Sequence, residues 1–162
     1  MSQAALSLLA NAFAPIGLAD VVFRAGKDVI ELLLKIHDAP TELTHLISSI
    51  QVLESAIAEA RAYLDDFATS RFVSDDHAAV PDITYILQRC QSEFDQLKRI
   101  AYATTAGPND SWSLLWRKKA VFALNEKDIE RSQSRLERYA YALETTLSVN
   151  KGCVYLLPSQ RV

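Results

Sequence analysis

The fold is decided by residues 43–67, which read LTHLISSIQVLESAIAEARAYLDDF. Apolar side chains recur there in steps of three and four residues without a missed position, at Leu43, Leu46, Ile50, Leu53, Ile57, Ala60, Leu64 and Phe67. Such steps place side chains on one face of an α-helix. A sustained alternation of the two is typical of a coiled coil or a packed bundle. The segment therefore predicts a long helix that buries one stripe against other helices.

The same spacing occurs in three further segments. Their stripes are Leu18, Val22, Ala25, Val29, Leu32, Leu33 and Ile36, then Ile83, Leu87, Cys90, Phe94, Leu97, Ala101 and Thr104, and finally Ile129, Ser132, Leu136, Ala140, Leu143 and Leu147. No segment alternates apolar and polar residues with the period of two that a half-buried strand shows. The fold class is therefore predicted to be all-α, a helical bundle of four long helices.

Turn-forming residues separate the stripes in the first half of the chain. Pro15 and Gly17 predict a kink or break after a first apolar segment, because proline removes a backbone donor and clashes with the preceding turn. Asp38 is a candidate N-cap and Pro40 suits a first helical turn. Residues 68–80 are polar and predict a loop.

The second half of the chain carries two more boundaries. The turn at 106–110 reads AGPND and precedes a predicted short helix with Trp112, Leu115, Trp116 and Phe122. Asn150 and Gly152 are predicted to end the last long helix. The chain is thus expected to hold one or two short helices besides the four long ones. Its predicted division is a bundle domain over 1–150 and a C-terminal tail or linker over 151–162.

Charge and cysteine content bound the function classes. The formal net charge of −3 argues against a nucleic-acid-binding protein, so no nucleic-acid partner is expected. Residues 1–81 carry 5 basic and 11 acidic side chains, whereas residues 82–162 carry 12 basic and 9 acidic ones. The mildly basic second half suits an acidic partner or anionic lipid, or else is a solvated surface of mixed charge. The two cysteines, Cys90 and Cys153, form no disulfide framework and predict a reducing, cytosolic setting.

Motifs that carry catalysis are absent from the sequence. There is no Gly-rich phosphate loop, no GxSxG elbow and no HExxH. His37 and His45 lie near one predicted corner, where capping and a solvated surface explain them better than a metal site. The sequence predicts that the protein is not an enzyme and that it uses no cofactor and no metal.

The N-terminal stretch is unusual because no side chain before Asp20 is charged. Its apolar residues favour bilayer insertion by about 3 to 5 kcal/mol in all, and Asp20 alone opposes insertion by about 2.5 to 3.5 kcal/mol at the membrane centre. A permanent transmembrane helix is therefore not predicted. Two hypotheses remain: a buried core helix, or a segment that enters a membrane only after oligomerisation. The candidate membrane-inserting side chains are Leu6, Leu8, Leu9, Phe13, Ile16, Leu18, Val22 and Phe23.

A second candidate site combines aromatic and basic residues. It comprises Trp116, Arg117, Lys118 and Lys119, followed by Arg131, Arg135 and Arg138 on one helical face. Aromatic rings beside cations suit a membrane interface or an acidic partner. The alternative is that the tryptophans anchor a short helix while the cations face water. The set is a candidate lipid- or partner-binding basic patch.

Several strings resemble the HeLo-like family, including its SesA type, which forms the N-terminal domain of fungal STAND (NLR-like) receptors. They are GLADVVFRAGK at 17–27, KIHDAPTEL at 35–43, WRKK at 116–119, and IER and RLERY within 129–139. Together with the small apolar N-terminus, the resemblance covers about residues 4–149 in order. The first two strings are the more specific ones, because charged helical segments converge easily.

This resemblance implies a helical effector or signalling domain that acts in regulated cell death and innate immunity during heterokaryon incompatibility. Such domains form homo-oligomers on activation and work with an NLR-like receptor or a fused nucleotide-binding module. In executioner members the apolar N-terminal helix inserts into the plasma membrane, so the implied location is cytoplasmic at rest and at the plasma membrane once activated. Asn11, Pro15 and Asp20 depart from an ideal membrane killer. A helical protein–protein interaction module without membrane activity is the alternative.

Overall fold

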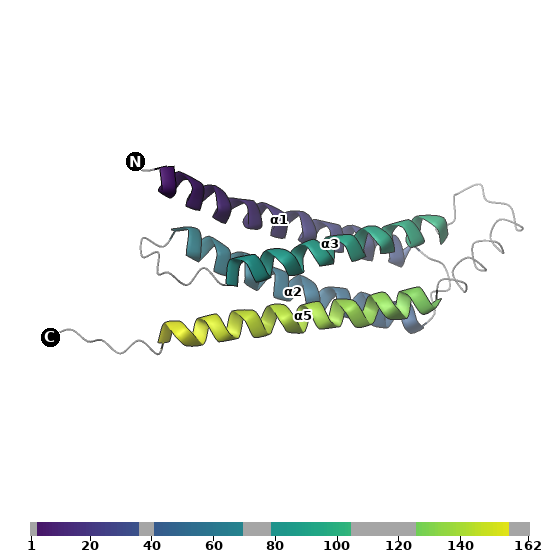
Figure 1. Ribbon diagram of the computed structural model, residues 1–162. Helices are drawn as coiled ribbons and strands as arrows, with labels where there is room; N and C mark the ends of the chain where they lie inside the picture. The colour runs from purple at the N-terminus through teal and green to yellow at the C-terminus, as the bar shows by residue number, and fades with distance from the viewer. Residues whose placement is uncertain (1–2, 36–40, 70–78, 105–125, 156–162) are drawn as a thin grey trace, which may run out of the picture.

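The computed structural model describes the backbone of residues 3–35, 41–69, 79–104 and 126–155, and the side chains of residues 14–35, 43–69, 79–103 and 127–150. Within these ranges the chain forms four long helices and no strand (Figure 1). They are α1 (Gln3–Leu34), α2 (Thr41–Thr69), α3 (Ala79–Thr104) and α5 (Glu126–Tyr155). The predicted all-α bundle of four long helices is confirmed.

The four helices alternate in direction along the chain, so that α1 and α3 run one way and α2 and α5 the other (Figure 1). α1 packs on α2 and α3, and α5 packs on the same two helices from the other side. In the described residues α1 and α5 make no contact with each other and lie on one diagonal of the bundle. In the described residues α5 is therefore the helix that lies away from α1.

The predicted stripes supply most of the core, although Leu18 and Leu32 of the α1 stripe are only half-buried against it. On α2 every stripe position from Leu43 to Leu64 is at most 1% exposed. On α3 the stripe from Ile83 to Ala101 is equally buried, and on α5 the positions from Ile129 to Leu147 are at most 3% exposed. Each buried leucine or isoleucine contributes about 1.5–3 kcal/mol relative to an exposed one. This sum of small terms holds the bundle together.

The predicted kink or break at Pro15 is not a helix boundary, because α1 runs continuously from Gln3 to Leu34 with Pro15 inside it. Proline cannot donate to the carbonyl four residues earlier, which costs the helix one hydrogen bond. Pro15 is buried and stands four residues before Ala19, which in turn stands three before Val22, and both of these are fully buried. The ring therefore extends the apolar stripe, and packing of α1 outweighs the lost bond.

The last helix is also longer than predicted. α5 passes through Asn150 and Gly152 and ends at Tyr155, so the predicted helix end is wrong. A glycine costs a helix only about 1 kcal/mol relative to alanine and does not by itself end it. α2 and α3 reach one or two residues into the predicted loop at 68–80, a difference that is usual for helix ends. The predicted short helix falls within residues 105–125 and lies outside the described residues.

Candidate functional site

The apolar N-terminal stretch forms the first half of α1. Of its candidate residues, Leu6, Leu8, Leu9 and Phe13 belong to the helix, but their side chains lie outside the described ones. The other four residues are Ile16, Leu18, Val22 and Phe23, of which Val22 is fully buried and the remaining three are half-buried against the core. This part of α1 is therefore seated in the bundle.

The outward face of the same stretch is small and uncharged. Ala14 and Gly17 are exposed, and Val21 is 49% exposed. A Cβ added at Gly17 would meet nothing within 4 Å. No helix in the described ranges has a window that is both long and apolar enough to cross a membrane.

Two ion pairs tie the second half of α1 to its neighbours. Arg61 of α2 places its Nη1 3.1 Å from Asp20 Oδ1, and Lys98 of α3 places its Nζ 2.8 Å from Asp28 Oδ2. The side chains in these pairs are from 24% to 60% exposed. Pairs of this kind contribute about 0.2–1 kcal/mol each. They fix the orientation of α1 more than they strengthen its attachment.

Gly26 lies at a close approach of α1 to both α2 and α3. A Cβ at this position would lie 3.1 Å from Glu54 Oε1 on α2 and 3.3 Å from Phe94 Cζ on α3. Both distances are tighter than ordinary van der Waals contact. The missing side chain at Gly26 therefore makes room for two others, one from α2 and one from α3.

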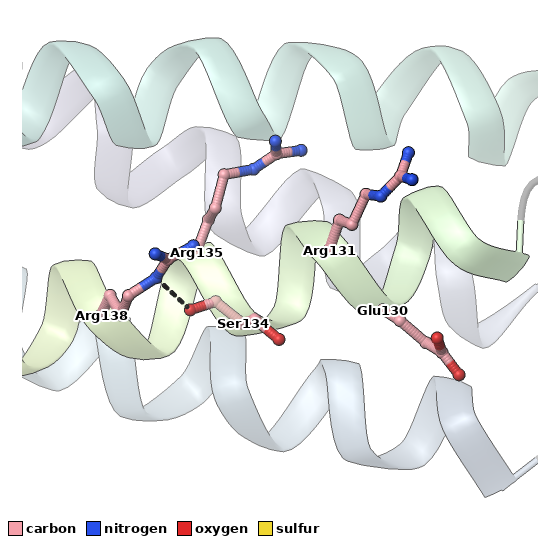
Figure 2. A pocket seen from close by; sticks show the side chains of 5 residues that line it. All are labelled: Glu130, Arg131, Ser134, Arg135 and Arg138. Atoms are coloured by element: carbon pink, nitrogen blue, oxygen red, sulfur yellow. Dashed lines mark hydrogen bonds between the residues drawn. The ribbon is translucent and has the colours of Figure 1, made fainter.

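The arginine row of α5 borders a shallow, open surface depression of about 270 Å³, together with Glu130 and Ser134. Figure 2 shows the side chains of Arg131 and Arg135 reaching toward α3, while Glu130 turns to the α2 side of the helix. Arg138 lies further along α5, where its Nε donates to the Ser134 carbonyl oxygen at 3.2 Å. The three guanidinium groups thus share one stretch of α5, as the spacing predicted.

Carboxylates already neutralise most of this row. Arg131 Nη1 donates to Asp128 at 3.1 Å, and Arg135 Nε lies 2.9 Å from Glu93 Oε1 on α3. Among the described residues, Arg138 has no carboxylate partner. The row therefore presents less free positive charge than its sequence suggests. The remaining members of the predicted patch, Trp116, Arg117, Lys118 and Lys119, lie outside the described residues.

A buried polar network joins α3 to α5 behind the row, and the sequence analysis missed it. Glu93 is only 9% exposed, and its Oε2 accepts a hydrogen bond of 3.2 Å from the buried Ser132 Oγ. Its other oxygen faces Arg135 at 2.9 Å, as an ion pair without hydrogen-bond geometry at Nε. Burial, and then the charge of Glu93, raise the pKa of the neighbouring Tyr139. Ser132, a polar residue within an apolar stripe, was the one signal that could have revealed the network.

The cysteine and histidine side chains of the described residues do not form a candidate metal site. Within them no group of three or more His, Cys, Asp or Glu side chains could hold a metal ion. Cys90 is fully buried, and its burial raises the pKa of the thiol to about 12, which suppresses the reactive thiolate at neutral pH. Of the two histidines of the predicted corner, His45 is exposed and His37 lies outside the described residues.

Compared with protein-family models, with curated proteins and with solved structures, the chain matches none of them.

Proposed function

We propose that this protein is an effector or signalling domain of the HeLo-like type, which self-associates on activation and engages a membrane through the N-terminal part of α1. In this role it serves regulated cell death in a fungal NLR-like system of non-self recognition. Its partners are further copies of itself, an NLR-like receptor or a fused nucleotide-binding module, and plasma membrane lipids. The resemblance of residues 4–149 to that family and the four-helix bundle support the proposal.

The observation that carries the proposal is the division of α1 into two parts. Its chain is free of charge up to Asp20, and the outward positions Ala14, Gly17 and Val21 add no polar side chain. From Asp20 onward, charged side chains tie the helix to α2 and α3. An uncharged segment continuous with an anchored one suits a helix that is held at rest and inserts when several copies are brought together.

In this mechanism the basic patch binds anionic lipid headgroups of the membrane after self-association. Arg138 contributes a cation without a carboxylate partner in the described part of the chain. The predicted short helix with Trp116 to Lys119 belongs to the same proposal, because aromatic and basic side chains together suit the headgroup region.

Dye release from vesicles tests the proposal. The full chain, fused to a tetramerising coiled coil, is added to phosphatidylserine-containing vesicles beside the same fusion lacking residues 1–13. This deletion spares Ala19 and Val22, which are core residues, so the bundle is expected to stay folded. The intact fusion should release the dye and the deletion should not. If the intact, folded oligomer releases no dye from the vesicles, the proposed membrane role is wrong.

The second candidate is a helical interaction module that self-associates without touching lipid. The finding that favours it is the absence of a membrane-spanning window in the described helices. The same vesicle assay separates the two candidates when it is paired with light scattering of the unfused chain. Self-association together with tight vesicles supports the interaction module.

A further inference from the structure

Three helices meet at Gly26, and a carboxylate is enclosed between them. Glu54 as a residue is half-buried, but its Oε1 atom is inaccessible to water and has no hydrogen-bond partner. The same atom lies 3.1 Å from the point where a Gly26 Cβ would stand, and the fully buried Phe94 closes the space from α3. α1 therefore shields this oxygen from water, and the oxygen gains no hydrogen bond from the protein.

The charged groups around Glu54 offset this cost only in part. Burial raises the pKa of the Glu54 carboxyl, and Lys27 of α1 lowers it by a smaller amount. Lys27 Nζ lies 4.7 Å from the centre of the Phe23 ring on its own helix. On α3, Lys98 forms an ion pair with Asp28 of α1. On α5, the carboxylate of Glu137 accepts a hydrogen bond from Ser49 of α2.

The consequence follows from linkage. A carboxyl whose pKa is raised in the docked state favours docking when it is neutral and opposes docking when it is ionised. Its favourable contribution is complete below the pKa of the undocked state and is lost as the pH rises through the docked one. The ionised form of Glu54 regains water when α1 moves away. Because α1 makes no contact with α5 in the described residues, α5 serves as the internal reference for such a movement.

We propose that Glu54 is a wedge built into the seat of α1: the enclosed Oε1 of its carboxylate, which has no hydrogen-bond partner at Gly26, weakens the docking of α1 on α2 and α3 and makes the release of this helix easier at neutral than at acidic pH. The inference deepens the proposed function, which requires α1 to be released, and rests on it for its biological meaning. The wedge itself is a property of the bundle and is tested without any membrane.

Hydrogen exchange of the full chain, followed by mass spectrometry, is the test. Glu54→Gln removes the charge at nearly constant shape, and Glu54→Met removes the polar group altogether. Glu144→Gln is the matched control, because Glu144 is exposed on α5, which does not contact α1 in the described residues. Peptides covering 14–34 report on α1 and peptides covering 127–150 report on α5. Each variant is compared with the wild type at the same pH, so that the intrinsic pH dependence of exchange cancels.

At about pH 7.5 both Glu54 variants should slow exchange in α1 roughly three- to fivefold, the low end for an unpartnered group because Glu54 is partly exposed. Exchange in α5 should change less. The ratio of Glu54→Gln to wild type should move toward one as the pH is lowered toward about 4, because the wild-type carboxyl becomes protonated. Unchanged or faster α1 exchange in both variants, or equal slowing in α1 and α5, would overturn the wedge. Either result leaves the vesicle assay unaffected, so the two proposals fail separately.

Discussion

Glu93 and Glu54 both lie between described helices of the bundle, but their carboxylate oxygens differ in the partners they have. Glu93, at the α3–α5 seam, has Ser132 Oγ on one oxygen and Arg135 on the other. Glu54, at the α1 seat, has an enclosed oxygen without any hydrogen-bond partner. Both side chains face neighbouring helices, yet only one of them is supplied with partners by its neighbours.

The difference indicates which helix contact is held in one arrangement by polar partners and which contact carries a cost from an unpartnered oxygen. A buried carboxylate with partners specifies how two helices sit on each other, because any slip leaves charges unpaired. A carboxylate without partners only adds a cost to the contact that encloses it. We therefore expect the α3–α5 seam to act as a joint that fixes how the two helices sit, and the α1 seat to carry a local cost at Glu54.

The largest expected effect concerns the joint. Glu93→Ala leaves Ser132 without its acceptor and Arg135 without its counter-charge, and should lower the free energy of unfolding by about 2 kcal/mol. Full burial of Arg135 would cost more, but this side chain is 34% exposed and can turn to water. Urea denaturation followed by circular dichroism measures the change.

Two variants serve as controls for that prediction. Asp95→Ala alters an exposed carboxylate on the same helix and should stay within about 0.5 kcal/mol of the wild type. Replacing Glu93 and Arg135 together by methionine should recover most of the loss, because no buried charge is left unpaired. A loss below about 0.5 kcal/mol for Glu93→Ala would contradict the view of the seam as a joint.

A smaller effect is expected at the two glycines of α1. Gly17→Ala should raise the free energy of unfolding by up to about 1 kcal/mol, because the new methyl meets nothing within 4 Å and alanine favours the helix. Gly26→Ala gains the same propensity but presses its methyl on Glu54 Oε1 and Phe94 Cζ. The second variant should therefore be clearly less stable than the first in the same urea titration. Equal gains in both would mean that α1 is not pressed against its neighbours at Gly26.

The spacing of apolar residues predicted the bundle well, because burial depends on the sum of many positions. Each stripe position from Leu43 to Leu64 contributes independently, so one unusual residue does not alter the outcome. The helix ends were predicted less well for the same reason. Pro15 and Gly152 are strong local signals, yet a single lost hydrogen bond or about 1 kcal/mol of propensity cannot outweigh a long packed face.

The candidate site could be predicted only in part. The spacing placed Arg131, Arg135 and Arg138 on one stretch of α5, and the structure agrees. It could not predict their neutralisation, because Glu93 lies 42 positions before Arg135 and meets it only after the helices have packed. The close contact at Gly26 could not be predicted for the same reason, since its two neighbouring side chains come from α2 and α3.

The smallest expected effect uses pH to compare Glu54 with a third glutamate. Glu137 on α5 accepts hydrogen bonds of 2.9 Å from Gln133 and from Ser49 of α2, and these bonds lower the pKa of its carboxyl. Its contribution to stability is therefore present above the unfolded-state pKa and is lost as the pH falls through the folded-state value. Glu54 has a raised pKa and must show the reverse dependence.

Glu137→Gln should accordingly destabilise the bundle at about pH 7 by a few tenths of a kcal/mol, since Glu137 is exposed and its bonds compete with water. The cost should shrink as the pH falls below the ordinary glutamate pKa of about 4.3, because the wild-type carboxyl then becomes protonated. Glu54→Gln should stabilise at about pH 7 and should lose this advantage at higher pH values than those at which the Glu137 effect is lost, because the pKa of Glu54 is raised and that of Glu137 is lowered. Urea denaturation of the three chains at matched pH values measures both trends. The two differences in free energy of unfolding, each variant against the wild type, should change with pH in opposite directions. A change in the same direction would contradict the contrast between Glu137, whose carboxyl has hydrogen-bond partners, and Glu54, whose enclosed oxygen has none.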